Sequence, residues 1–143
     1  MIRVIVTASR TWTDPEPIRA DLDQLLAQHG QLVVAHGDAK QGGDRIAAGW
    51  GARKPRIIVE AFPAKWKLHG RVAGIIRNTE LVAAGADLCL AYIRDCNEPT
   101  CPRFRPHGSH GATHCADLAE RAGIETRRTK WNDRRGQVVV CRD

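Results

Sequence analysis

Three cysteines and three histidines lie within one twenty-residue segment of the chain, CNEPTCPRFRPHGSHGATHC. Cys96, Cys101, His107 and His110 follow one another at spacings close to those of zinc sites. Thiolate and imidazole groups suit Zn²⁺, and four of them close a tetrahedral site that leaves no position for water. We therefore expect a structural zinc ion in this segment.

Alternatives to this four-ligand site stay open. The segment could be a loop with unligated thiols, or His114 and Cys115 could replace His110 as ligands. A site with three protein ligands would leave one position for water and would favour a hydrolase. Cys89 and Cys141 lie in apolar runs and are predicted to be buried small side chains.

A second group of residues is suited to binding phosphate. Gly42–Gly43 and Gly111–Ala112–Thr113 each begin a predicted helix, where free N–H groups and small side chains let an anion approach closely. Arg10 would pair with a phosphate, and Trp12 or Trp66 would stack on a base. No Gly-x-Gly-x-x-Gly motif follows the first predicted strand, and no Gly-Lys-Ser/Thr loop occurs. Ordinary dehydrogenases and kinase-like NTPases are therefore not favoured.

The elements that must position these residues alternate between strands and helices. Short β-branched runs predict strands at residues 1–7, 31–35, 56–62, 87–93 and 124–129, with a further candidate at 137–141. Helical spacing predicts helices at 14–29, with Asp14 as N-cap, and at 44–53, 71–84 and 111–122, whereas 65–70 is predicted to be loop. This order predicts an α/β fold, a Rossmann-like three-layer sandwich with a mainly parallel sheet of five or six strands.

The composition is that of one soluble domain. The 143 residues are 43% hydrophobic and 27% charged, and we expect a single domain over 1–143 with an insertion at 94–110 and a short tail at 130–143. The start of the chain lacks the features of a signal peptide, which favours a cytoplasmic location. The net charge of +6 favours an anionic partner and does not by itself distinguish a nucleotide from nucleic acid.

Four segments together resemble the YspA-like branch of the SLOG superfamily over about residues 1–129. They are the strand ending TASR, the run HGDAKQGGDRIAA, the pair Arg77–Asn78 and the segment HGATHCADLAERAGI. The superfamily also contains the LOG ("lonely guy") nucleotide hydrolases and the DNA-processing protein DprA, and many of its small members are encoded by phages. The resemblance implies a Rossmann-like sheet that binds a nucleotide or nucleotide-derived ligand, in a protein that pairs through helices as a dimer.

The resemblance also carries over site residues by position. Ser9 and Arg10 match a Gly-Ser-Arg turn in which Ala8 replaces the glycine. Combined with the residues at the ends of the predicted strands, the candidate ligand-binding set is Ser9, Arg10, Trp12, Gly37, Asp38, Gly42, Gly43, Asp44, Trp66, Arg77, Asn78, Gly111, Ala112 and Thr113.

One departure from the LOG pattern bears on turnover. LOG hydrolases carry Gly-Gly-x-Gly-Thr-x-x-Glu at the last helix, and counting from Gly111 places Cys115 where the catalytic glutamate would be. Asp117 is the nearest carboxylate. We therefore favour a binder that senses or sequesters a nucleotide signal. A nucleotide or N-glycoside hydrolase using Asp38, Asp44, His114 or Asp117 is the alternative.

A nucleic-acid binder of DprA type is a third possibility. The last part of the chain gathers basic residues around Trp131: Arg121, Arg127, Arg128, Lys130, Arg134, Arg135 and Arg142. Acidic residues lie among them, so a solvated face is the more economical interpretation.

Overall fold

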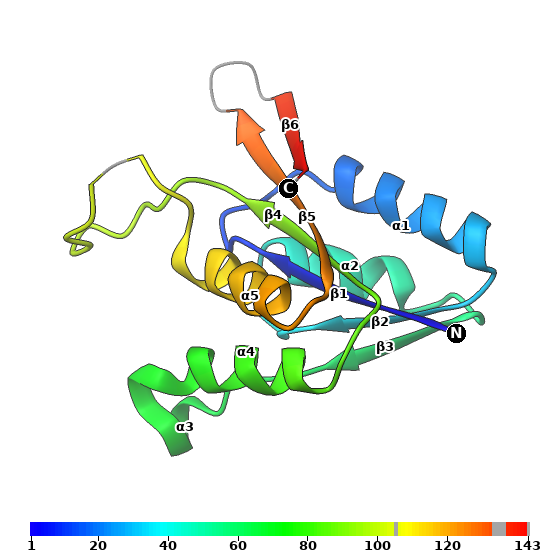
Figure 1. Cartoon of the computed structure of the whole chain (residues 1–143), viewed down its shortest axis with the longest axis horizontal. Helices are drawn as coiled ribbons and strands as arrows, with labels where there is room; N and C mark the ends of the chain where they lie inside the picture. Colours follow the sequence, from blue (N-terminus) through cyan, green and yellow to red (C-terminus); the bar gives the residue numbers. More distant parts are fainter. Residues whose placement is uncertain (105, 133–136, 143) are drawn as a thin grey trace.

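The protein forms one six-stranded sheet with helices on both faces (Figure 1). The computed structural model describes residues 1–104, 106–132 and 137–142. The strand order is β3-β2-β1-β4-β5-β6, in which the first five strands are parallel and β6 runs antiparallel to β5. The strands are β1 (Ile2–Ala8), β2 (Leu32–His36), β3 (Ile57–Ala61), β4 (Leu88–Ile93), β5 (Glu125–Asn132) and β6 (Gln137–Arg142). The predicted α/β sandwich is confirmed.

The helices divide between the two faces of the sheet. On one face α1 (Glu16–His29) and α2 (Gly43–Gly51) pack against the strands, and on the other face lie α4 (Ala73–Ala83) and α5 (His110–Arg121). Alternate residues of β1 supply both cores, because side chains of a strand point to opposite faces. Val4 and Val6 join the core beneath α1 and α2, whereas Ile5 joins the core beneath α4 and α5.

The segment predicted to be a loop at 65–70 is instead helical, and that prediction was wrong. It forms α3 (Trp66–His69), followed by a single 3₁₀ turn, η1 (Gly70–Val72). The carbonyl of Lys65 accepts hydrogen bonds from the N–H groups of Leu68 and His69 at 3.0 and 2.9 Å. Such a short helix does not complete the two turns over which apolar periodicity becomes visible in a sequence.

The first helix begins one residue later than predicted. Pro15, rather than Asp14, occupies the N-cap position, although the Asp14 side chain accepts the N–H of Glu16 at 3.0 Å. Asp14 therefore still satisfies one of the free N–H groups of the first turn. At the other end Gly30 has a positive φ of 76° and closes the helix through an N–H···O bond to Leu26.

The centre of the sheet is where the chain reverses its direction of winding. From β1 the strands progress outward to β3, and the chain then returns to place β4 on the other side of β1. In open parallel sheets the crevice at the carboxyl ends of such neighbouring strands is the usual ligand-binding position. Within the described ranges, no helix has the length and apolar character needed to cross a membrane.

Candidate functional site

A cavity of about 680 Å³ opens at the carboxyl ends of β1 and β4. This volume is in the range that small-molecule sites occupy. Its walls come from the turn after β1, the α3–α4 segment, the insertion after β4 and the first turns of α5. Ten of the predicted ligand-binding residues line it: Ser9, Arg10, Gly37, Asp44, Trp66, Arg77, Asn78, Gly111, Ala112 and Thr113.

Trp12 is not one of them, and its predicted stacking role is wrong. The side chain is fully buried in the core, with its ring centroid 5.6 Å from that of Tyr92 and 5.2 Å from that of Trp131. Its indole N–H donates to the carbonyl of Asp14 at 2.7 Å. Trp66, by contrast, is half exposed at the cavity, so it is the tryptophan that can meet a base.

The glycine pair that begins α2 serves close packing. A Cβ atom on Gly42 would lie 2.6 Å from the carbonyl oxygen of Ser9, and one on Gly43 would overlap the Cβ of Ala8. Neither glycine lines the cavity. The phosphate role predicted for this pair is therefore not supported by its position, because the turn after β1 fills the space that a phosphate would need.

Asp38, another predicted ligand-binding residue, does not line the cavity, although its neighbours Gly37 and Ala39 do. Its side chain is exposed, and its backbone has a positive φ of 56°.

The N-terminus of α5 is the helix start that does face the cavity. Ser109 is its N-cap, and a Cβ on exposed Gly111 would meet nothing within 4 Å. The hydroxyl of Thr113 is buried and has no hydrogen-bond partner among the described residues. Free backbone N–H groups, the positive end of a twelve-residue helix and an available hydroxyl together form an arrangement that binds anions.

Arginines dominate the charged residues of the cavity. The lining includes Arg10, Arg71, Arg77, Arg103 and Arg121, against the carboxylates of Asp44, Glu98 and Asp117. The guanidinium of Arg10 lies over the Trp66 ring, 5.7 Å from its centroid. Sequence reasoning missed Arg71 and Arg103 and grouped Arg121 with the basic residues around Trp131, because the three are scattered along the chain and no motif joins them.

Arg77 and Asn78 connect the walls of the cavity to one another. Arg77 donates through Nη1 to the carbonyl of Gly37 and through Nε to the side-chain oxygen of Asn78 at 2.9 Å. The Asn78 amide donates to the carbonyl of Gly111 at 3.2 Å and lies 3.1 Å from His114 Nδ1. The pair therefore links α4 to the turn after β2 and to the start of α5.

Asp44 is the most unusual charged group in the cavity. Only 5% of it is exposed, its Oδ2 accepts the N–H of Ala39 at 3.3 Å, and its Oδ1 has no hydrogen-bond partner in the described part of the chain. Burial raises the pKa of this carboxyl from 3.8 to about 6, although the backbone N–H groups of Ala39 and Gly37 and the charge of Arg77 offset part of the rise. A group titrating near 6 exchanges a proton close to neutral pH.

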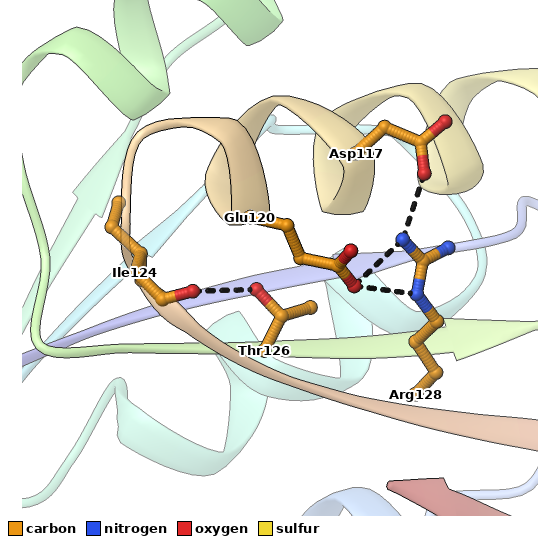
Figure 2. Close-up of polar contacts among 5 residues, drawn as sticks. All are labelled: Asp117, Glu120, Ile124, Thr126 and Arg128. Atoms are coloured by element: carbon orange, nitrogen blue, oxygen red, sulfur yellow. Dashed lines mark hydrogen bonds and ion pairs between the residues drawn. The ribbon is translucent and has the colours of Figure 1, made fainter. Parts of the chain in front are cut away.

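Asp117 is already engaged by β5, as Figure 2 shows. Its Oδ1 accepts from Arg128 Nη2 at 2.7 Å, and the same arginine donates from Nη2 and Nε to Glu120 Oε1 at 2.8 and 3.0 Å. These hydrogen bonds connect α5 to β5.

Two of the basic residues predicted for nucleic-acid binding have acidic partners. They are Arg128 and Arg127, and the latter pairs with Glu125 at 3.4 Å. Arg134 and Arg135 lie outside the described residues, as do the side chains of Arg142 and Cys141.

The position that the LOG pattern gives to a glutamate lies in the core. Cys115 is fully buried and faces Cys89, which is also fully buried, as predicted. The hydrogen bond between the two thiols raises the pKa of Cys89, and burial raises it further. Cys115 does not line the cavity, so this position offers a ligand no acid.

The four predicted metal ligands come together at one edge of the cavity. One donor atom from each of Cys96, Cys101, His107 and His110 lies within 4.8 Å of all the others. His110 Nε2 is 3.3 Å from His107 Nε2 and from Cys101 Sγ, and 3.6 Å from Cys96 Sγ. Tetrahedral Zn²⁺ with ordinary bond lengths requires about 3.3 Å between two nitrogens and about 3.6 Å between nitrogen and sulfur. These residues lie close enough to hold a metal ion.

Comparison with known proteins gives matches to both a family and a relative. The model of the YAcAr family, described as "YspA, cpYpsA-related SLOG family", matches residues 2–69. The Gene 61 protein of Mycobacterium phage D29 is 40% identical over 129 residues, which cover 87% of this chain and 93% of that protein. No solved structure matches significantly.

Proposed function

Because the chain belongs to the YspA, cpYpsA-related SLOG family, we propose that it binds a nucleotide or nucleotide-derived small molecule in the cavity at the carboxyl ends of β1 and β4. The family indicates a nucleotide-related binding or hydrolase role. We propose binding without turnover, in which the protein senses or sequesters a nucleotide signal. The phage origin of its relative is compatible with sequestration of a signal made by the host cell.

One observation carries this proposal: the α5 N-terminus, Arg10 and Trp66 line the same cavity. The helix start and the guanidinium are suited to phosphate. The half-exposed indole offers an apolar face to a base. The LOG glutamate position, filled here by buried Cys115, supports binding rather than hydrolysis.

Thermal denaturation with a panel of linear and cyclic nucleotides tests the proposal. A bound ligand stabilises the folded state, so a ligand present at one hundred times its Kd adds about 2.7 kcal/mol. Native mass spectrometry of the freshly purified protein would identify a ligand that co-purifies. The proposal fails if no nucleotide raises the Tm and none co-purifies.

Hydrolysis is the second candidate, and it is favoured by one observation, the titration of Asp44 near pH 6 inside the cavity. A carboxyl with that pKa can donate a proton to a leaving base at neutral pH. Incubating the protein with nucleoside monophosphates and measuring the release of free base by chromatography distinguishes the two functions. If the wild-type protein releases free base and Asp44→Asn does not, the protein hydrolyses a nucleotide rather than only binding it.

We further propose that Cys96, Cys101, His107 and His110 bind one Zn²⁺ as a closed structural site. The insertion offers few apolar side chains to a core, since Phe104 is 97% exposed. A metal would give such a loop a fixed shape. With four protein ligands the ion has no open position, so its contribution is to folding rather than to chemistry.

Metal analysis of the protein and replacement of the metal by Co²⁺ test the zinc site. We expect one equivalent of zinc and the visible absorption of tetrahedral thiolate-bound Co²⁺. Cys101→Ser should lose both signals, whereas Cys89→Ala, which removes a thiol outside the cluster, should keep them. Zinc content below one tenth of an equivalent after purification with added Zn²⁺ would overturn the proposal.

A further inference from the structure

Asp44 Oδ1 is a buried hydrogen-bond acceptor that no described residue satisfies. Nearly all buried polar atoms in folded proteins have a partner, because water is lost on burial and a free acceptor is costly. The other oxygen of the carboxylate is occupied by the Ala39 N–H. Asp44 is one of the residues that line the cavity, so a bound molecule that reaches this carboxyl would supply the missing partner.

The charge of Asp44 restricts what that molecule presents to it. A carboxylate repels phosphate, so the phosphate must bind elsewhere, and the α5 N-terminus and Arg10 provide that position. Only one oxygen of Asp44 is unpartnered, which suits a single donor such as a hydroxyl. Trp66, on the opposite face of the sheet from α2, offers the surface on which the base stacks.

In a nucleotide the sugar joins the base to the phosphate. With the base at Trp66 and the phosphate at α5, the ribose is the part that remains to face Asp44 at the start of α2. We propose that Asp44 Oδ1 accepts a hydrogen bond from a ribose hydroxyl and thereby selects ribonucleotides over deoxyribonucleotides. This assignment rests on the proposed function and names the sugar class that the same site takes.

A charged acceptor makes this discrimination large. Hydrogen bonds to ionised groups are among the stronger ones in proteins, and losing one leaves the buried carboxylate without a partner again. A deoxyribonucleotide that lacks the bonded hydroxyl should therefore bind about 10- to 100-fold more weakly than its ribonucleotide.

Isothermal titration calorimetry with nucleoside 5′-monophosphates of the four common bases, and with their 2′-deoxy and 3′-deoxy forms, tests the assignment. At pH 7.5 we expect the wild-type protein to prefer at least one ribonucleotide by about tenfold or more over one deoxy form. In Asp44→Asn this preference should fall to within about threefold. Glu16→Gln is the charge-matched control, because exposed Glu16 lies in the first turn of α1 and does not line the cavity.

The outcomes separate the two proposals. Equal affinities for ribose and deoxyribose forms, or a preference that persists in Asp44→Asn, would overturn the assignment while leaving nucleotide binding intact. A variant that changes the order of preference among the bases, but not between the sugars, would show that Asp44 contacts the base and would also overturn it. If none of the monophosphates binds the wild type, the proposed function fails and the assignment fails with it.

Discussion

The hydroxyl of Ser109 is hydrogen-bonded to the hydroxyl of Ser9, although the two residues are 100 positions apart in the chain. Ser9 follows β1 and Ser109 is the N-cap of α5. Ser9 Oγ also accepts the N–H of Arg94 at 2.9 Å, directly after β4. The carboxyl ends of both central strands and the start of α5 are therefore joined at one point of the cavity wall.

Removing the metal should loosen the start of α5. His110 is both a candidate ligand and the first residue of α5, and the Cys96 N–H donates to the His107 carbonyl at 2.7 Å. Without an ion, the base of the insertion is held by hydrogen bonds such as this one and the one from the Ser109 N–H to the Arg94 carbonyl at 2.9 Å. We expect faster hydrogen–deuterium exchange at residues 107–113 in the chelator-treated protein than in the zinc-loaded protein.

Peptides from β1 and β2 serve as the internal control for that experiment, since these strands lie in the middle of the sheet. Their exchange should be the same in both states. Unchanged exchange at the start of α5 would show that the metal does not order this part of the cavity wall.

Replacing Asp44 by Asn should stabilise the protein at neutral pH. The folded protein holds the Asp44 proton more tightly than the unfolded chain, because burial raises the pKa from 3.8 to about 6. Below pH 4 neither state is charged there, and as the pH rises through 6 the folded state must accept a buried charge. That charge destabilises it by up to about 3 kcal/mol at pH 7.5.

Thermal denaturation at pH 4.5 and pH 7.5 measures the effect. The Tm of Asp44→Asn minus that of the wild type should be more positive at pH 7.5. Asp38 and Arg77 act electrostatically on Asp44, and His36 interacts with both of them, but all three are present in both proteins and largely cancel in the difference. A Tm difference that is independent of pH would contradict the raised pKa.

Gly43→Ala should destabilise the protein, although alanine is the better helix former. The added methyl group would overlap Ala8 Cβ at the end of β1, and moving α2 away from the strand opens the core beneath it. Overpacking of this kind costs about 1–3 kcal/mol. Gly49→Ala in the same helix meets nothing within 4 Å and should stabilise by about 0.5–1 kcal/mol. Urea denaturation should show a lower free energy of unfolding for Gly43→Ala and a higher one for Gly49→Ala than for the wild type.

Arg10→Gln should weaken phosphate recognition selectively. Arg10 is exposed at the cavity and contacts the Trp66 face, so its removal should leave the fold intact. We expect the affinity for AMP to fall about tenfold and its salt dependence to decrease, with little change for adenosine. Arg53→Gln, on an exposed turn after α2, is the charge-matched control. Equal losses for AMP and adenosine would place Arg10 against the nucleoside rather than the phosphate.

Much of the fold was predictable because local patterns agree with it. Apolar β-branched runs and helical spacing placed five parallel strands and four of the helices, and the Cys–His spacing placed all four clustered ligands. The predictions that were wrong concern a very short helix and the exact end of a longer one. α3 is only four residues long, and the N-cap at Pro15 differs from Asp14 by one position. Local spacing carries little information at that scale.

By itself, the sequence determined the α/β architecture, the cluster of two cysteines and two histidines, and the family, because each depends on the order and spacing of residues along the chain. Where two residues have similar positions relative to the predicted elements, only the tertiary structure decided which of them faces the cavity. Trp12 and Trp66 both follow strands, yet the first is packed against Tyr92 and the second faces the cavity. Asp44 stands out for the same reason, since the burial that leaves one of its oxygens without a partner among the described residues arises only in the folded chain.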